Sequence, residues 1–154
     1  MYNIYPVMRK SILPALFIIW FSTACEDDKN DSRGLVIMTG IACGWCSSPD
    51  SLAVTSLKTT YELIGACGEP SKSIIEHTQS EVWKELRASL NWNDFKAIDV
   101  NTCALCADGC DTWIRIQNGA ESHYIRFTNS SPEIEPINEF VDKLKAVHQE
   151  FRQK

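Results

Sequence analysis

Two cysteines form a motif that could do redox chemistry, Cys43-Gly44-Trp45-Cys46. A C-x-x-C pair exchanges disulfides efficiently when a helix N-terminus lowers the pKa of one thiol. Here the motif is followed by Ser47-Ser48-Pro49-Asp50 and then by an alternating strand pattern, so no helix is predicted to stabilise a thiolate. We therefore favour structural disulfides for Cys43 and Cys46 and keep thiol–disulfide exchange as the alternative.

Another cysteine, Cys25, stands at the end of an N-terminal segment that has the pattern of an export signal. Basic residues at Arg9 and Lys10 precede the apolar block 12–21, and small residues then run into Cys25. A block of this length is too short to span a bilayer, which needs about 20 residues, and is typical of a secretory signal. The cysteine resembles the lipobox of bacterial lipoproteins, although Ser22 stands where leucine is usual. We predict a signal peptide at 1–24, lipidation of Cys25, an acidic tether at 25–33 and one domain at 34–154.

The cysteines of the predicted domain fall into two groups of three. An even number in an exported chain indicates a disulfide framework, and the sequence leaves the pairing open. A bridge between the groups would close a long loop and stabilise the fold by about 4 kcal/mol. The candidates are Cys43, Cys46 and Cys67 in the first group and Cys103, Cys106 and Cys110 in the second.

The same spacing also suggests a zinc site built from Cys43, Cys46, Cys103 and Cys106. The 56 residues between the two pairs exceed the roughly 15–20 of a compact zinc site. We expect no metal and no other cofactor.

Charge and motifs exclude several function classes. The chain has 15 basic and 20 acidic residues, and loss of the signal would leave 13 basic residues and a net charge of −7. No basic cluster remains, which excludes nucleic-acid binding. No nucleotide, hydrolase or metalloprotease motif occurs, and we expect His77, His123 and His148 to be surface or hydrogen-bonded residues. His148 is assigned to the polar side of the last helix. No catalytic residue is predicted.

The first half of the domain carries strand patterns followed by one helix. Apolar or alternating runs predict three strands, over residues 35–38, 51–55 and 59–64. Residues 69–77 are predicted as a loop. Thr78 and Glu81 match a capping box, which predicts a helix start. The helix has one apolar stripe, formed by Val82, Trp83, Leu86 and Leu90.

The second half contains a hairpin at 112–128 and a closing helix. Asn118-Gly119 predicts a type I′ turn that pairs Gln117 with Ala120. This register places four apolar residues on one face, Ile114, Ile116, Ile125 and Phe127. The closing helix starts near Pro136 and has an apolar stripe made by Ile137, Phe140, Val141, Leu144, Val147 and Phe151.

Three aromatic residues are candidates for a partner-binding face. The predicted register sets Trp113 opposite Tyr124 on the other face of the hairpin, and Trp45 follows the first strand. Packing is the ordinary role of such residues, but an aromatic sheet face without helix cover can bind a partner.

Together these elements predict an α+β domain stapled by disulfides. We expect an antiparallel sheet of about four to five strands with two helices on one face, in the order strands, helix, hairpin, helix.

The residues Thr39 to Cys46, with Pro49 and the strand after it, resemble a group of uncharacterised Bacteroidetes-type envelope lipoprotein domains. Asp111 to Ile114 and the closing helix resemble the second half of that domain, while Ser47-Ser48 and the second cysteine group depart from it. The acidic run after Cys25 also resembles the surface-export signal of such lipoproteins. The resemblance implies an α+β fold and an envelope location, and it implies no activity.

These observations predict a non-catalytic domain with a binding or structural role, anchored by lipid in the bacterial cell envelope, with the outer membrane as its expected site. Its partners would be the membrane, through the lipid, and an unidentified envelope or extracellular molecule. The alternative function is an envelope thiol–disulfide redox protein that uses Cys43 and Cys46.

Overall fold

The computed structural model describes residues 34–45, 47–128 and 131–154. The predicted signal peptide, Cys25, the acidic segment up to residue 33 and Cys46 lie outside the described residues. Within the described part of the chain, no helix has the length and apolar character needed to cross a membrane.

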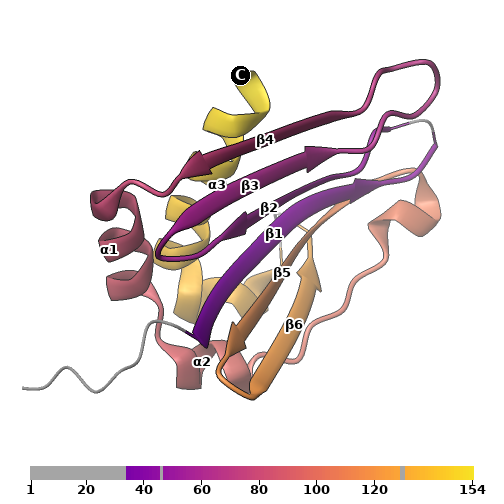
Figure 1. The fold of residues 1–154 in the computed structure, drawn as a ribbon. Coiled ribbons are helices and arrows are strands. Elements are labelled where there is room, and N and C mark those ends of the chain that lie inside the picture. The colour runs from indigo at the N-terminus through magenta and orange to yellow at the C-terminus, as the bar shows by residue number, and fades with distance from the viewer. Residues whose placement is uncertain (1–33, 46, 129–130) are drawn as a thin grey trace, which may run out of the picture.

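Six strands form one fully antiparallel sheet in the order β4-β3-β2-β1-β5-β6 (Figure 1). The first four form a meander, and the chain then returns to place β5 beside β1. The strands are β1 Leu35–Cys43, β2 Asp50–Val54, β3 Lys58–Leu63, β4 Lys72–His77, β5 Cys110–Asn118 and β6 Glu121–Phe127.

The predicted count of about four to five strands is too low, because β4 lies within the segment predicted as a loop. β4 pairs with β3 from Lys72 to His77, although most of its side chains are exposed. Solvent wets an edge strand on several sides, so its sequence lacks a clear alternation of apolar and polar residues. The backbone ladder therefore forms without the pattern on which the prediction relied.

The α-helices pack on one face of the sheet, but the structure describes three of them where two were predicted, because the short α2 was not recognised. Figure 1 shows α3 behind the strands, α1 at the left, where it contacts α3, and α2 near the β5–β6 turn. The described helical segments are α1 Ser80–Ser89, α2 Trp92–Ala97, α3 Asn138–Gln153 and the short 3-10 segments η2 Ala104–Ala107 and η3 Pro132–Ile137.

The hydrophobic core lies between the sheet and these helices. The central side chains come from alternate residues of the strands and from the apolar stripes of α1 and α3. Phe95 of α2 is fully buried and its ring meets that of Phe140 edge-on at 6.4 Å. The largest fully buried side chains are Tyr61, Phe95, Phe127, Phe140, Ile37, Leu52, Leu86, Ile114, Ile116, Ile125, Ile137 and Leu144.

The predicted capping box at Thr78 and Glu81 is wrong. Helix α1 begins at Ser80, and its N-cap, Gln79, makes no side-chain capping bond. The hydroxyl of Thr78 instead lies 2.9 Å from that of Thr59 on β3. Thr78 thus continues the β3–β4 pairing, where the sequence suggested a helix start.

The predicted hairpin register is also wrong, by two residues. Asn118 pairs with Glu121, so the turn residues are Gly119 and Ala120, and only Gly119 has a positive φ, of 61°. Glycine at the first turn position is typical of a type II′ turn rather than type I′. A shift of two residues keeps every side chain on its face, so the apolar face of the hairpin is as predicted.

Candidate functional site

A buried carboxylate, Asp50, begins β2 on the helix-covered side of the sheet. Asp50, Leu52 and Val54 alternate along the strand and are all buried. The Oδ1 atom of Asp50 accepts a hydrogen bond from the backbone N–H of Ile41 at 3.0 Å. Its Oδ2 atom accepts one from the hydroxyl of Tyr61 at 3.2 Å. β1 and β3, the two strands beside β2, therefore both hold this carboxylate.

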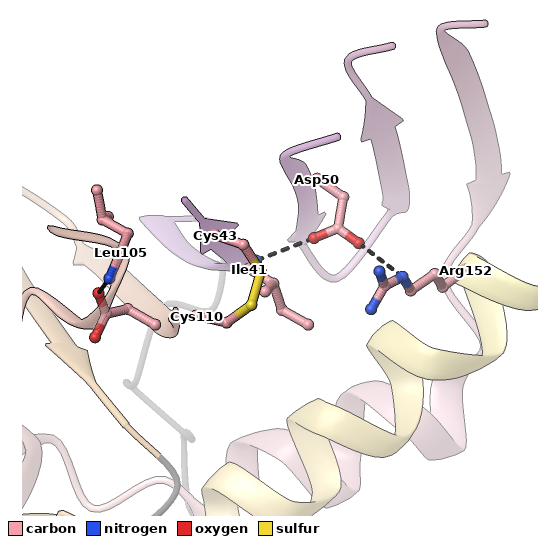
Figure 2. Close-up of a disulfide and its surroundings, with 7 residues drawn as sticks. Ile41, Cys43, Asp50, Leu105, Cys110 and Arg152 are labelled. Carbon is pink, nitrogen blue, oxygen red and sulfur yellow. Dashed lines mark hydrogen bonds and ion pairs between the residues drawn. A yellow bond between two sulfur atoms is a disulfide. The ribbon is translucent and has the colours of Figure 1, made fainter. Parts of the chain in front are cut away.

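Two basic side chains reach the same carboxylate from α3. Nε2 of His148 lies 3.2 Å from Oδ1 of Asp50, and Nε of Arg152 lies 3.4 Å from Oδ2. Figure 2 shows Asp50 between Ile41 and Arg152, close to the Cys43–Cys110 disulfide. His148 and Arg152 are one helical turn apart, so both can face the start of β2.

The assignment of His148 to the polar side of the last helix is wrong. Its side chain is only 6% exposed, and its ring centroid lies 5.9 Å from that of Tyr61. Within the described residues, Nε2 makes no well-aligned hydrogen bond, so its approach to Asp50 is an electrostatic contact. The site thus contains a buried polar nitrogen with hydrogen-bonding capacity left over.

The charges of the cluster shift two pKa values. Burial alone would raise the pKa of Asp50, but contact with His148, the N–H of Ile41 and the charge of Arg152 lower it overall. Burial, followed by the charge of Asp50 and the bond donated to it, raises the pKa of Tyr61 to about 12. Asp50 is therefore an anion at neutral pH, and Tyr61 keeps its proton.

A pocket of about 500 Å³ opens beside the cluster, over the last turns of α3 and the ends of β1 and β5. None of the residues that line it is acidic, and most of its polar side chains can donate hydrogen bonds. The lining residues are Ile41, Thr112, Lys145, His148, Gln149, Arg152 and Gln153. We call this the α3 pocket.

A second hollow of about 410 Å³ adjoins the α3 pocket, because both are lined by Ile41 and Arg152. Its other walls come from the loop after β1 and from β3, including Ser48, Tyr61 and Lys72. Arg152 thus stands between two hollows and lies directly over Asp50 (Figure 2).

Disulfide bonds lie at the same end of the sheet, where β1 ends and β5 begins. Cys43 and Cys110 face each other on β1 and β5 and are bonded, which links the two cysteine groups across 67 residues. Cys103 and Cys106 are bonded to each other, and Cys67 is also disulfide-bonded. The predicted framework is therefore present, although Cys43 does not bond to its neighbour in the C-x-x-C motif.

A second buried carboxylate, Asp111, fastens the loop that carries Cys103 and Cys106. Asp111 accepts hydrogen bonds from the Thr102 hydroxyl at 2.5 Å and from the backbone N–H of Leu105 at 3.2 Å. Burial alone would raise the pKa of Asp111, but the hydrogen bonds from Thr102 and from the N–H groups of Leu105 and Ala104, with the charge of Arg126, lower it overall. The hydrogen-bond donors to Asp111 are thus a hydroxyl and backbone N–H groups, and they hold η2 against β5.

The three candidate aromatic residues are not all brought together. The rings of Trp113 and Tyr124 stack with centroids 6.3 Å apart on the face of the sheet opposite the helices. Contrary to the prediction, they are not directly opposite each other in the β5–β6 ladder, because Trp113 pairs with Arg126 and Arg115 pairs with Tyr124. Trp45 is 87% exposed, and no ring contact among the described residues joins it to this pair.

Trp113 also has a packing role. A β-carbon on Gly40 would come within 2.7 Å of the Trp113 ring, so the indole lies directly over the glycine of the neighbouring strand. The Trp113–Tyr124 pair therefore covers the sheet as well as exposing an aromatic edge.

The other two histidines are surface or hydrogen-bonded residues. His77 is exposed on β4, and a ring nitrogen of His123 lies 2.8 Å from the carbonyl oxygen of Ile98. Among the described residues, no group of three His, Cys, Asp or Glu residues is arranged to hold a metal ion.

Sequence reasoning missed the site formed by Asp50, Tyr61, His148 and Arg152. Comparison with known proteins adds no family to this description: no family model matches the chain, and no curated protein matches it either.

Proposed function

We propose that this protein is a lipid-anchored domain of the bacterial cell envelope that binds a small anionic ligand, carrying a carboxylate or phosphate group, in the α3 pocket. The observation that carries the binding role is the composition of that pocket: Lys145, His148 and Arg152 line it, and none of its lining residues is acidic. In a chain with a net charge of −5, a pocket lined by basic side chains without acids stands apart from the rest of the molecule.

The chemistry of the lining residues supports an anion with several acceptor atoms. Guanidinium and ammonium groups form charge-assisted hydrogen bonds to carboxylate and phosphate oxygens. The side-chain amides of Gln149 and Gln153 line the same pocket and can donate further bonds. Asp50 fixes one side of the pocket, because its contacts with His148 and Arg152 hold both side chains in place.

The N-terminal segment supports the anchor and the location. The apolar block ending at Cys25 and the acidic run after it match a bacterial lipoprotein, and a disulfide framework suits an exported chain. The resemblance to Bacteroidetes-type envelope lipoprotein domains belongs to the same proposal. The outer membrane is the proposed site.

Binding is tested by calorimetry on the purified protein with citrate and inorganic phosphate as probes. We expect saturable binding of at least one probe, and we expect Lys145→Gln to weaken it by about tenfold through loss of one charged hydrogen bond. Lys143→Gln is the matched control, because Lys143 lies on the same helix, does not line the pocket and pairs with Glu139 at 3.0 Å. Absence of binding, or equal weakening by both variants, would contradict the pocket assignment.

The anchor is tested by Cys25→Ser in the full chain. We expect the variant to remain unprocessed or to be released from membranes, whereas the wild-type protein is processed and retained. Mass spectrometry of the mature protein should show acylation of Cys25. Normal processing and membrane retention of the variant would refute lipidation at this residue without affecting the binding test.

A further inference from the structure

The two edge strands of the sheet, β4 and β6, differ in whether another segment pairs with their outer side. At β6, the segment beside Asn101 closes the edge: Arg126 donates its N–H to Val100 at 3.0 Å and accepts from the N–H of Thr102 at 2.8 Å. At β4, no described segment pairs with the outer side of the strand. An open edge of this kind offers unpaired backbone groups to another strand.

The hydrogen-bond phase identifies the groups that β4 turns outward. The N–H of Thr78 donates to the carbonyl oxygen of Leu57 at 3.2 Å, in the same register as the β3–β4 pairing. Hydrogen-bonded pairs recur at every second residue of an antiparallel ladder. Lys72, Ile74 and Glu76 therefore bond to β3. The outward N–H and C=O groups belong to Ser73, Ile75 and His77.

The charges along β4 are complementary to themselves. Lys72 and Glu76 lie two residues before and two residues after Ile74, and the three side chains share one face of the sheet. Within the chain, Glu76 also pairs with Lys154 at 2.8 Å, so in a dimer its carboxylate would lie between Lys154 and Lys72 of the other copy. A two-fold axis at Ile74 would set each Lys72 opposite the Glu76 of the other strand and would set the two Ile74 side chains against each other. These would be non-hydrogen-bonded pairs, in which facing side chains are closest.

We propose that β4 pairs antiparallel with β4 of a second copy of this chain, joining two six-stranded sheets edge to edge. Ser73 and Ile75 of each copy make the backbone hydrogen bonds across the axis. Ile75, whose side chain is 66% exposed in the single chain, then lies opposite Ser73 of the other copy and diagonal to its symmetry mate. The interface is the same surface on both copies and closes on itself, so assembly stops at two. This proposal is independent of ligand binding in the α3 pocket.

The charge pattern allows a test by co-purification, in which a charge-swapped double variant should restore the association that each single variant weakens. Two differently tagged full-length copies are co-expressed, extracted from membranes in mild detergent and captured through one tag. We expect the second tag to co-purify. Lys72→Glu alone and Glu76→Lys alone should each reduce recovery by about tenfold, because each sets like charges opposite each other at both pairs. Lys72→Glu is the cleaner of the two, because it leaves the Glu76–Lys154 pair within the chain in place. The double variant, Lys72→Glu with Glu76→Lys, should restore it.

The matched control is Lys84→Glu, an exposed lysine on α1 away from the edge, which should leave recovery unchanged. Absence of co-purification in the wild type would overturn the proposal, as would failure of the double variant to recover when its circular dichroism spectrum matches the wild type.

A second experiment tests the register. The Cα atoms of a non-hydrogen-bonded antiparallel pair lie about 4.5 Å apart, which a disulfide can bridge. Ile74→Cys should therefore cross-link two copies in the membrane, and Ile75→Cys should cross-link far less, because Ile75 faces Ser73 of the partner strand. Cross-linking of Ile75→Cys in preference to Ile74→Cys, or cross-linking of Ile74→Cys to a different protein, would overturn the proposed pairing.

Discussion

Two buried aspartates flank the end of β1, and their surroundings differ. Asp50 on β2 pairs with Ile41 of β1, and Asp111 on β5 pairs with Ala42 of β1. Successive residues of a strand point to opposite faces, so Asp50 lies under the helices and Asp111 lies under the η2 loop. The exposed fractions of the two residues are 4% and 0%, and both carboxyl pKa values are lowered.

The difference lies in the groups that satisfy each carboxylate. Asp111 is bound by a threonine hydroxyl and a backbone N–H, which form a closed clamp on a disulfide-bonded loop. Asp50 also accepts a backbone N–H, that of Ile41, but it is further contacted by ionisable side chains, and two of these, His148 and Arg152, line the α3 pocket. The one charged side chain that acts on Asp111, Arg126, does not line that pocket. Burial and a shifted pKa are shared by both aspartates, so neither property alone distinguishes a candidate site from a structural clamp.

The largest effect is expected from removing the Asp50 carboxylate. Asp50→Ala should lower the free energy of unfolding by about 3–5 kcal/mol, because it leaves a buried histidine, a buried phenol and a backbone N–H without their shared partner. Urea denaturation measures the loss. Asp50→Asn keeps the shape and an acceptor oxygen, so it should cost clearly less than Asp50→Ala. Equal stability of Asp50→Ala and the wild type would show that the cluster does not support the fold.

The sequence contains signals for part of this cluster. Asp50 stands two residues before Leu52 and four before Val54, so strand alternation places it on the buried face. His148 lies four residues after Leu144 and three before Phe151, both in the predicted apolar stripe, so helical spacing places it on that stripe. A polar residue at an inward position predicts a buried polar contact, and this inference was available from the sequence.

Other features had no local signal. The contact of Asp50 with Arg152 joins residues about 100 positions apart, and the pairing of Cys43 with Cys110 depends on β5 lying beside β1. Strand order arises from the packing of the whole chain, which periodicity does not report. The layer arrangement, the buried faces and the presence of disulfides were predictable, whereas the edge strand β4 and the partners of each cysteine were not.

The next effect concerns alkaline stability. The pKa of Tyr61 is about 12 in the folded protein and 10.0 for an ordinary tyrosine, so unfolding releases a proton between these two pH values. Stability is then fully present below pH 10 and falls by about 2–3 kcal/mol as pH rises to 12. Tyr61→Phe should be less stable at neutral pH and should show a smaller fall over this range. Parallel pH curves for the two proteins would contradict the raised pKa of Tyr61.

A smaller effect is expected at the second aspartate. Asp111→Asn keeps one acceptor oxygen but removes the charge that strengthens both hydrogen bonds, so the free energy of unfolding should fall by about 1–2 kcal/mol. Hydrogen exchange should quicken at Leu105, whose N–H bonds to Asp111. Exchange in α3 should not change, and citrate or phosphate should bind as in the wild type. Weaker anion binding in this variant would remove the distinction between the two aspartates.

The smallest expected effect is on phosphate affinity, and it distinguishes most directly the aspartate beside the pocket, Asp50, from the structural one, Asp111. Asp50→Asn removes a negative charge next to His148 and Arg152 while leaving both side chains in the pocket lining. At a few ångströms, one unit charge is worth on the order of 1 kcal/mol in a well-solvated pocket. Phosphate affinity should therefore rise about fivefold in Asp50→Asn. Calorimetry at two salt concentrations checks the cause, because added salt should reduce the gain if it is electrostatic. An unchanged affinity would mean that Asp50 supports the pocket mechanically and does not tune its charge.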